Sequence, residues 1–312
     1  MENNENLVRV KTLSTRINND FVSATKLNPR INIEGNLKSR KNKLSKLLHE
    51  NLQDYLDLYD EAIRLTICSH ELFKEHFPEK STPSFVVLTA KMVTLMLGIK
   101  QMLEAGFSDC VKNLERPLIE ANEVFFACLI DPELSKSFSS TSALYDNDKF
   151  YWENFSKGKL DKQCQKLYEK IELKKEDIEN LNLRKSALKK FLSESIHSSF
   201  NAAFSSYLMM SIDFKIEDNI YGKVTTAYPR LLISLIEETH LFNNLLNDAL
   251  DKKVCPELEG IETLNSYKLY KFYNEKFHLL FHTYYLKLEE DSKSYSKFFE
   301  DIRAYLESNN GT

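Results

Sequence analysis

Glycine and proline are scarce in this chain, which has only seven of each among its 312 residues. Their usual shares are roughly 7% and 5% of a globular protein. Turns and β-rich architectures depend on both residue types. Lysine, glutamate, leucine, asparagine and aromatic residues are abundant instead. The composition therefore excludes a turn-rich β fold and predicts an all-α protein.

Cysteine is also sparse, and its five positions are odd in number and widely spaced. No C-x-x-C pair of the kind found in zinc sites is present. We expect free thiols in a reducing compartment, and hence a cytoplasmic location. The residues are Cys68, Cys110, Cys128, Cys164 and Cys255.

Long hydrophobic runs are missing as well. The most apolar stretch, residues 85–103, is interrupted by Lys91 and Lys100 and falls short of the roughly 20 apolar residues that a membrane span requires. The N-terminus begins with acidic residues and lacks the apolar segment of a secretory signal. These features predict a core helix at 85–103, no contact with a membrane and no export.

Charge of one sign does not dominate, since the net charge is −4 with 28% charged residues. Such a balance gives no global attraction to nucleic acid or to anionic lipid. Charge therefore leaves the partner open between a protein and RNA.

Residues 1–36 are polar and rich in asparagine. Their only apolar pattern is Val8, Val10 and Leu13, which alternate in the way typical of an isolated strand. We expect a flexible polar arm here. Residues 37–312 are predicted to form a helical domain, with a sub-boundary near 133–158 where the chain becomes rich in serine and aspartate.

A long helix is predicted at 37–77, because its apolar residues recur at steps of three or four and so share one face. That seam is long enough to pair two copies as a homodimer. Together with eight further helices, it predicts an irregular antiparallel bundle of about eight to ten helices. The further helices are expected at 85–105, 108–130, 159–171, 175–198, 200–212, 229–250, 262–290 and 292–308, the last two being separate.

Phosphate-loop, dinucleotide-fold, serine-elbow and His-Glu-x-x-His motifs are all absent. Arg64 and His70, in RLTICSH, match the loose spacing of HEPN-type ribonucleases. There a histidine would act as acid or base and an arginine would stabilise charge on the scissile phosphate. The alternative reading is an ordinary solvated helix face.

A second candidate is a di-metal site of the carboxylate-bundle type. Two Glu-x-x-His motifs on separate predicted helices, with single glutamates from two others, follow the order in which ferritin-like bundles hold two metal ions. The predicted ligands are Glu120, Glu194, His197, Glu238, Glu275 and His278. The pair His278 and His282 also has metal-ligand spacing, although the aromatic residues around it favour a packed helix.

A third candidate is a polar centre formed by Arg116 and Glu120, four apart on one helix, and by Ser193 and His197, four apart on another. An arginine, a carboxylate and a histidine that converge in a helical core can bind or cleave a phosphodiester. The alternative is a buried polar network that only fixes the packing of two helices.

The segments that carry this centre are Gly106-Phe107 followed by Arg116-Pro117-Leu118-Ile119-Glu120, and Leu192-Ser193 through His197. Together they resemble a prokaryotic all-helical family of unknown function, over roughly residues 88–208. The resemblance implies an all-helical fold and a shared polar centre but no established activity. Such proteins are similar in general to the helical modules of bacterial conflict and abortive-infection systems.

We therefore expect an interaction or regulatory module of a bacterial defence or stress system, with an unidentified protein or RNA as its partner and no cofactor. A HEPN-like RNA endonuclease and a di-metal carboxylate-bundle protein are the two alternatives. None of these groups of residues shows whether the protein is an enzyme.

Overall fold

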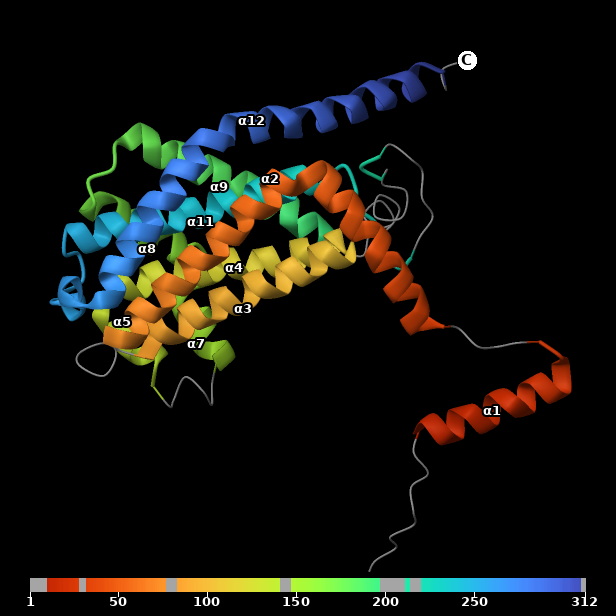
Figure 1. Ribbon diagram of the computed structural model, residues 1–312. Helices are drawn as coiled ribbons and strands as arrows, with labels where there is room; N and C mark the ends of the chain where they lie inside the picture. Colours follow the sequence, from red (N-terminus) through yellow and green to blue (C-terminus); the bar gives the residue numbers. More distant parts are fainter. Residues whose placement is uncertain are drawn as a thin grey trace, which may run out of the picture.

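The computed structural model confirms the all-α fold (Figure 1). The described residues form ten α-helices and two short 3-10 helices, η1 (Pro256–Leu258) and η2 (Ile261–Thr263). Among the described residues, Ser211 and Thr225 form an isolated antiparallel bridge. A helix was predicted at 200–212, so its last residues are not helical, and the rest of that range lies outside the described residues. The structure describes residues 10–27, 32–76, 83–140, 147–196, 211–213 and 220–309.

Three helices that follow one another in the sequence build the centre of the bundle. They are α2 (Ile33–His76), α3 (Pro83–Ala105) and α4 (Ser108–Ile130), and each begins and ends close to its predicted bounds. α3 packs along both α2 and α4. The aromatic rings of Phe73 and Phe125 pack with centroids 5.3 Å apart in the core between α2 and α4. Aromatic pairs at this distance add to the stabilisation from apolar burial.

The apolar seam predicted on α2 is buried inside the chain. Leu44, Leu48 and Leu52 are almost inaccessible, and Tyr55 donates a hydrogen bond to the carbonyl of Leu288 at 2.7 Å. α3, α11 (Tyr228–Asp251) and α12 (Asn265–Asn309) are the helices that pack on α2. The seam therefore stabilises the fold of a single chain, and the homodimer predicted through this helix stays a prediction.

The apolar helix α3 is long enough, by length and composition alone, to cross a membrane. In this structure it lies in the bundle, with Phe85, Met92, Ile99 and Leu103 buried against its neighbours. The same helix also has exposed apolar residues, Val87 and Leu97, so only one face of it lies in the core.

The N-terminal arm is more ordered than predicted. Residues Val10–Thr25 form the helix α1, and α2 already begins at Ile33. Leu13, Ile17 and Phe21 are spaced by four, which is the helical period, and this pattern outweighs the short alternation that suggested a strand. All three side chains are exposed, and α1 lies apart from the bundle (Figure 1).

Four shorter helices follow α4. They are α5 (Pro132–Phe138), α7 (Asn147–Asn154), α8 (Lys159–Lys170) and α9 (Lys175–Ile196). Asp131 caps α5 by accepting a hydrogen bond from a backbone amide. α5 and α7 lie within the segment 133–158 where a sub-boundary was predicted, or begin one residue before it, and α8 and α9 pack against α4.

The last two helices, α11 and α12, lie side by side and run in opposite directions (Figure 1). α11 has Pro229 in its first turn, close to the start at 229 that was predicted for this helix. The two helices predicted at 262–290 and 292–308 are in fact the single helix α12, so that prediction is wrong. No glycine or proline interrupts the chain there, and a Glu289–Lys293 ion pair of 2.9 Å spans the expected break.

Candidate functional site

The predicted ribonuclease pair is not brought together. Arg64 is exposed on α2 and forms an ion pair with Glu61, one turn away. His70 is half-buried, and its Nδ1 lies 3.1 Å from the hydroxyl of Thr89 on α3. The two residues are six positions apart, and each position rotates the side-chain direction by about 100°. Arg64 and His70 therefore lie on different sides of α2.

The predicted polar centre is assembled only in part. The Arg116 guanidinium donates a hydrogen bond of 3.1 Å to the hydroxyl of Ser193, which connects α4 to α9. Glu120, one turn further along α4, accepts a hydrogen bond from the Tyr151 hydroxyl instead. His197 lies outside the described residues. Arg116 is exposed, so this contact is at the surface and not in a core.

The predicted di-metal ligands have other neighbours. Glu120 is bonded to Tyr151, Glu238 forms an ion pair of 2.9 Å with Arg184, and Glu275 is exposed. The side chain of Glu194 is outside the described part of the chain, like His197. The carboxylates of Glu120, Glu238 and Glu275 do not join His278 in a metal-ligand cluster among the described residues.

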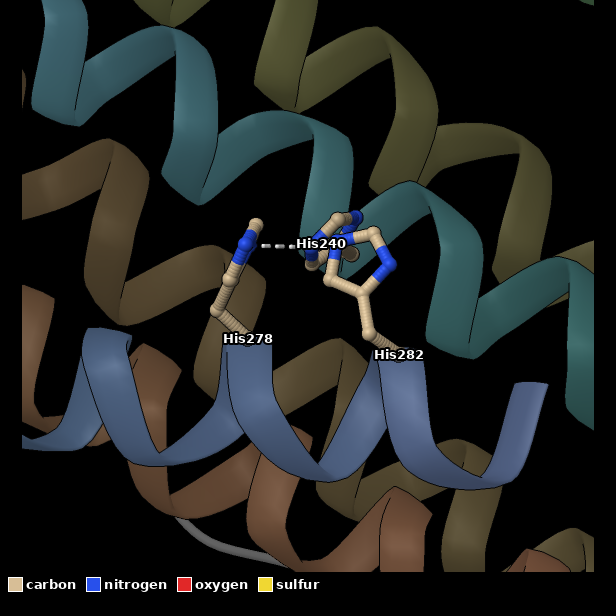
Figure 2. A group of neighbouring side chains, drawn as sticks. All are labelled: His240, His278 and His282. Atoms are coloured by element: carbon tan, nitrogen blue, oxygen red, sulfur yellow. Dashed lines mark hydrogen bonds between the residues drawn. The ribbon is translucent and has the colours of Figure 1, made fainter.

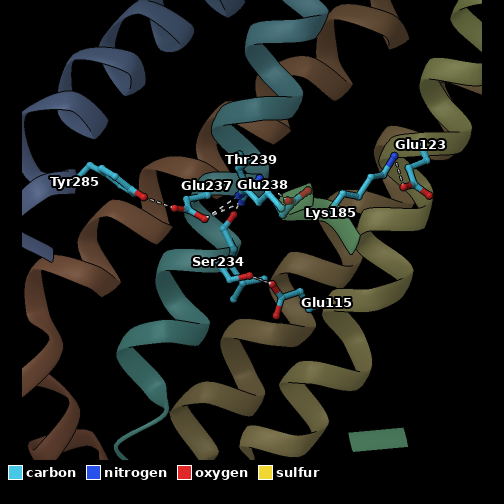
Figure 3. A network of polar contacts seen from close by, with 10 residues as sticks. Glu115, Glu123, Lys185, Ser234, Glu237, Glu238, Thr239 and Tyr285 are labelled. Atoms are coloured by element: carbon cyan, nitrogen blue, oxygen red, sulfur yellow. Dashed lines mark hydrogen bonds and ion pairs between the residues drawn. The ribbon is translucent and has the colours of Figure 1, made fainter. Parts of the chain in front are cut away.

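A network of charged residues connects α9 to α11 and α12 (Figure 3). Arg184 of α9 donates to Glu237 at 3.1 and 2.8 Å through Nε and Nη2, and pairs with Glu238 through Nη1. The Tyr285 hydroxyl of α12 donates to the other oxygen of Glu237. All three nitrogens of the guanidinium thus have a carboxylate partner, which offsets the cost of burying these charges.

Glu115 is the most deeply buried acid in this region. Its carboxyl accepts a hydrogen bond from the Ser234 hydroxyl (Figure 3). Burial raises the pKa of Glu115 to about 8, and the hydrogen bond from Ser234 opposes this shift only in part. At neutral pH the side chain is therefore mainly protonated and uncharged.

A second group of ion pairs connects α9 to α4, where the carboxylate of Glu123 contacts two lysines of α9. Lys185 lies 2.5 Å and Lys189 lies 2.8 Å from the same carboxylate oxygen of Glu123. Glu123 is buried, and Asp161 of α8 lies 3.7 Å from both lysines. These ion pairs hold α9 against α4 and have a structural role.

Three histidines from α11 and α12 form a separate cluster (Figure 2). One nitrogen from each of His240, His278 and His282 lies within 4.8 Å of the others. Nε2 of His240 and Nδ1 of His278 are 3.1 Å apart. His278 and His282 are four apart on α12, so their rings project from one face toward α11.

The packing around His240 fixes its ring. The ring stacks on Phe281 with centroids 3.8 Å apart, and the amide nitrogen of Asn244 lies 3.2 Å from Nε2. Phe281 is buried and also stacks on Tyr285, the residue that donates to Glu237. The aromatic face of α12 therefore positions the histidine cluster next to the charged network.

Two of the three histidines have a lowered pKa. Burial, followed by the nearby His278, His282 and Arg184, lowers the pKa of His240 to about 3. Burial and His282 also lower the pKa of His278. A neutral imidazole has a free lone pair for a metal ion, whereas an imidazolium must first lose a proton.

The donor set suits a borderline transition metal. Imidazole nitrogens favour zinc, copper and nickel over magnesium and calcium. Nitrogens that share a tetrahedral zinc ion at about 2.0–2.1 Å lie about 3.3 Å apart, close to the His240–His278 spacing of 3.1 Å. His278 and His282 are exposed, so an ion held here would keep a ligand position open to solvent.

Sequence reasoning considered the His278 and His282 pair and preferred a packed aromatic helix. The aromatic residues do pack, since Phe277 and Phe281 are buried, but the two histidines lie on the exposed side of the same helix. It did not propose His240 at all. The spacing of four was the available signal, and the third ligand lies 38 positions earlier on another helix.

The chain matches no protein-family model, no curated protein and no solved structure. The resemblance of the Arg116–Glu120 and Ser193–His197 segments to a prokaryotic helical family therefore stays a prediction.

Proposed function

We propose that this protein binds one divalent transition-metal ion, with zinc as its preferred ion, through His240, His278 and His282. The observation that carries the proposal is the approach of three imidazoles from two helices, with one nitrogen of each within 4.8 Å of the others. Imidazoles this close can offer their nitrogen lone pairs to one shared cation. The stacked Phe281 ring restricts His240 before the ion binds.

A site with three protein ligands keeps a fourth position for water or for another ligand, unlike closed structural zinc sites. Zinc in such a site polarises the group that it binds and lowers the pKa of bound water to about 7. The exposure of His278 and His282 leaves that position accessible to a partner. The site therefore suits an ion whose coordination is completed from outside the chain.

Isothermal titration of the dialysed full-length protein with zinc sulfate tests the proposal. We expect saturation at one zinc per chain, and at least about a tenfold loss of affinity in His240→Ala and in His282→Ala, since even outer residues of metal sites change affinity by 10- to 100-fold. His49→Ala is the matched control, because His49 is exposed on α2 and contacts only the Ser45 carbonyl at 2.7 Å. Equal losses in the control and site variants, or no saturable binding, contradict the proposal.

An interaction or regulatory module is the second candidate function, and a bacterial defence or stress system is its proposed setting. Leu279 and Leu286 support it, because they are 68% and 72% exposed on α12. Large apolar side chains that are exposed together on one helix face favour a protein partner. Chemical crosslinking in cell extracts tests this function. Crosslinks from Lys268 and Lys287 of α12 to a second protein, which are lost in the Leu279→Glu variant, would support it. Unchanged crosslinking in that variant would contradict it.

We also propose a cytoplasmic location. The free thiols support it, since all five cysteines are unpaired and four of them are buried. A reducing compartment preserves such thiols. Fractionation of cells that express the full chain, with the protein in the soluble cytoplasmic fraction, is the expected result.

A further inference from the structure

Helix α12 has apolar residues on two opposite faces. One face, with Tyr270, Phe277 and Leu288, is buried against the bundle. On the opposite face Phe272 is 58% exposed, and Leu279 and Leu286 are more exposed still. Among the described residues, none covers this second face.

The exposed residues Phe272, Leu279 and Leu286 recur every seven positions. This is the repeat by which helices pair in coiled coils, where residues three earlier or four later complete the seam. Leu269 and Thr283 occupy such intermediate positions and are exposed as well. The stripe therefore has the geometry of a helix-pairing surface.

A second copy of α12 fits this stripe when the two helices run in opposite directions. With Leu279 at the centre of a two-fold axis, each Leu279 contacts its equivalent, and Phe272 lies opposite Leu286 of the second copy. A two-fold contact of this kind uses the same surface on both subunits and is self-complementary. The large ring of Phe272 is then matched by the smaller side chain of Leu286.

Charges along one edge of the stripe complement each other in this register. Lys268, Glu275, His282 and Glu289 follow at intervals of seven along the edge nearest the histidine cluster. In an antiparallel pair, the residues of this edge face the same edge of the other helix. Lys268 then lies opposite Glu289 of the second copy, and Glu275 lies opposite His282 of the second copy.

Glu275 is exposed, and no ion pair is formed by its carboxylate within the described part of the chain. His282 is one of the three candidate zinc ligands. A carboxylate oxygen is a usual zinc ligand beside imidazoles, and three histidines leave one tetrahedral position to fill. The same pairing that buries the apolar stripe therefore brings a suitable fourth ligand to each ion.

We propose that two copies of this protein pair antiparallel through the exposed stripe of α12, and that Glu275 of each copy completes the zinc site of the other. The inference rests on the proposed function, because it uses the ion at His240, His278 and His282. It makes zinc a link between the subunits, with two ions per dimer. Glu275, predicted from the sequence as a metal ligand, then acts across the interface and not within its own chain.

Light scattering coupled to size exclusion tests this in the full-length protein. After dialysis against a chelator we expect a mass near 36.4 kDa, and with one equivalent of zinc a mass near twice that value. Leu279→Glu should stay monomeric while it still binds one zinc per chain. Val87→Glu is the matched control, since Val87 is an exposed apolar residue on α3. Its dimer should form normally.

Separate variants test Glu275 as a zinc ligand and the antiparallel register of the two helices. Glu275→Gln should weaken the zinc-dependent dimer at least tenfold, whereas Glu259→Gln, at another exposed glutamate, should not. Lys268→Glu should weaken the dimer, and adding Glu289→Lys should restore it, because the two charges face each other only in the antiparallel register.

The outcomes separate the two proposals. Zinc binding by a protein that stays monomeric at all zinc concentrations overturns the dimer and leaves the metal site intact. A dimer that forms equally without zinc and is unaffected by Glu275→Gln overturns the role of Glu275. Absence of zinc binding by the wild-type protein overturns the proposed function itself.

Discussion

Nε2 of His240 lies 3.1 Å from Nδ1 of His278, although 38 positions separate the two residues. The approach follows from the antiparallel packing of α11 on α12 and from the stacking of His240 on Phe281. His282 adds a third imidazole one turn along α12 (Figure 2). Two ordinary helices thus present a three-nitrogen site at the surface of the bundle.

Zinc should raise the thermal stability of the wild-type protein. A ligand that binds only the folded state stabilises it by about 2.7 kcal/mol at 100 times its dissociation constant. A protein of this size gains roughly 2–4 °C in Tm for each kcal/mol. Differential scanning fluorimetry with and without zinc should therefore show a rise of several degrees, which is lost in His278→Ala. A rise of the same size in that variant would point to zinc bound elsewhere.

The stability of the fold should fall as pH rises from about 5 to 8, in part because of Glu115. Its folded pKa of about 8 lies above the ordinary value of 4.5, so in this window the unfolded chain loses a proton that the folded chain retains. The contribution is fully present below the unfolded pKa and is lost as pH rises, with a limiting slope of about 1.4 kcal/mol per pH unit.

Glu115→Gln should flatten this part of the profile, because glutamine keeps the partner of Ser234 and does not ionise. Urea unfolding at several pH values measures the slope. Glu259→Gln, at an exposed position, should leave the slope as it is. Parallel profiles for wild type and Glu115→Gln would show that Glu115 is already ionised in the folded protein.

Arg184→Met should destabilise the protein by about 3–5 kcal/mol, because it leaves the buried carboxylate of Glu238 without its partner. A second substitution, Glu238→Gln, should recover a large part of that loss. Chemical denaturation of the single and double variants measures both effects. If the losses in unfolding free energy of the two single variants add up in the double variant, Arg184 and Glu238 are not coupled in the way that their 2.9 Å distance indicates.

Gly222→Ala should cost more than Gly158→Ala. Both glycines have positive φ, at +101° and +76°, so alanine strains the backbone at each. At Gly222 a Cβ would also lie 2.2 Å from the carbonyl oxygen of Ala105, whereas at Gly158 it would meet no atom within 4 Å. We expect about 1 kcal/mol at Gly158 and several at Gly222, measured by urea unfolding. Equal costs would mean that the 222 turn does not pack on the end of α3.

Most of the fold could be predicted because helix formation depends on local spacing. The bounds of α4 and the buried face of α2 followed from apolar residues repeated every three or four positions. The helix α1 was missed because a three-residue alternation was weighed above the spacing of Leu13, Ile17 and Phe21. The unbroken α12 was missed although no glycine or proline lies near 291, and the Glu289–Lys293 ion pair supports the helix there.

The candidate site was far less predictable. Glu120 and Arg116 share a face of α4, as expected, yet each has a different partner on another helix. Side-chain partners depend on how helices are rotated and paired, and a single sequence carries no direct record of that rotation.

The sequence by itself determined that this protein is helical, where most of its helices begin and end, and that His278 and His282 share one face of a helix. Only the tertiary structure decided that α11 packs against that face and brings His240 to it, and that the seam of α2 is used inside the chain. The physical reason is that local periodicity specifies which face of a helix is apolar, whereas the pairing of faces is set by the packing of the whole core.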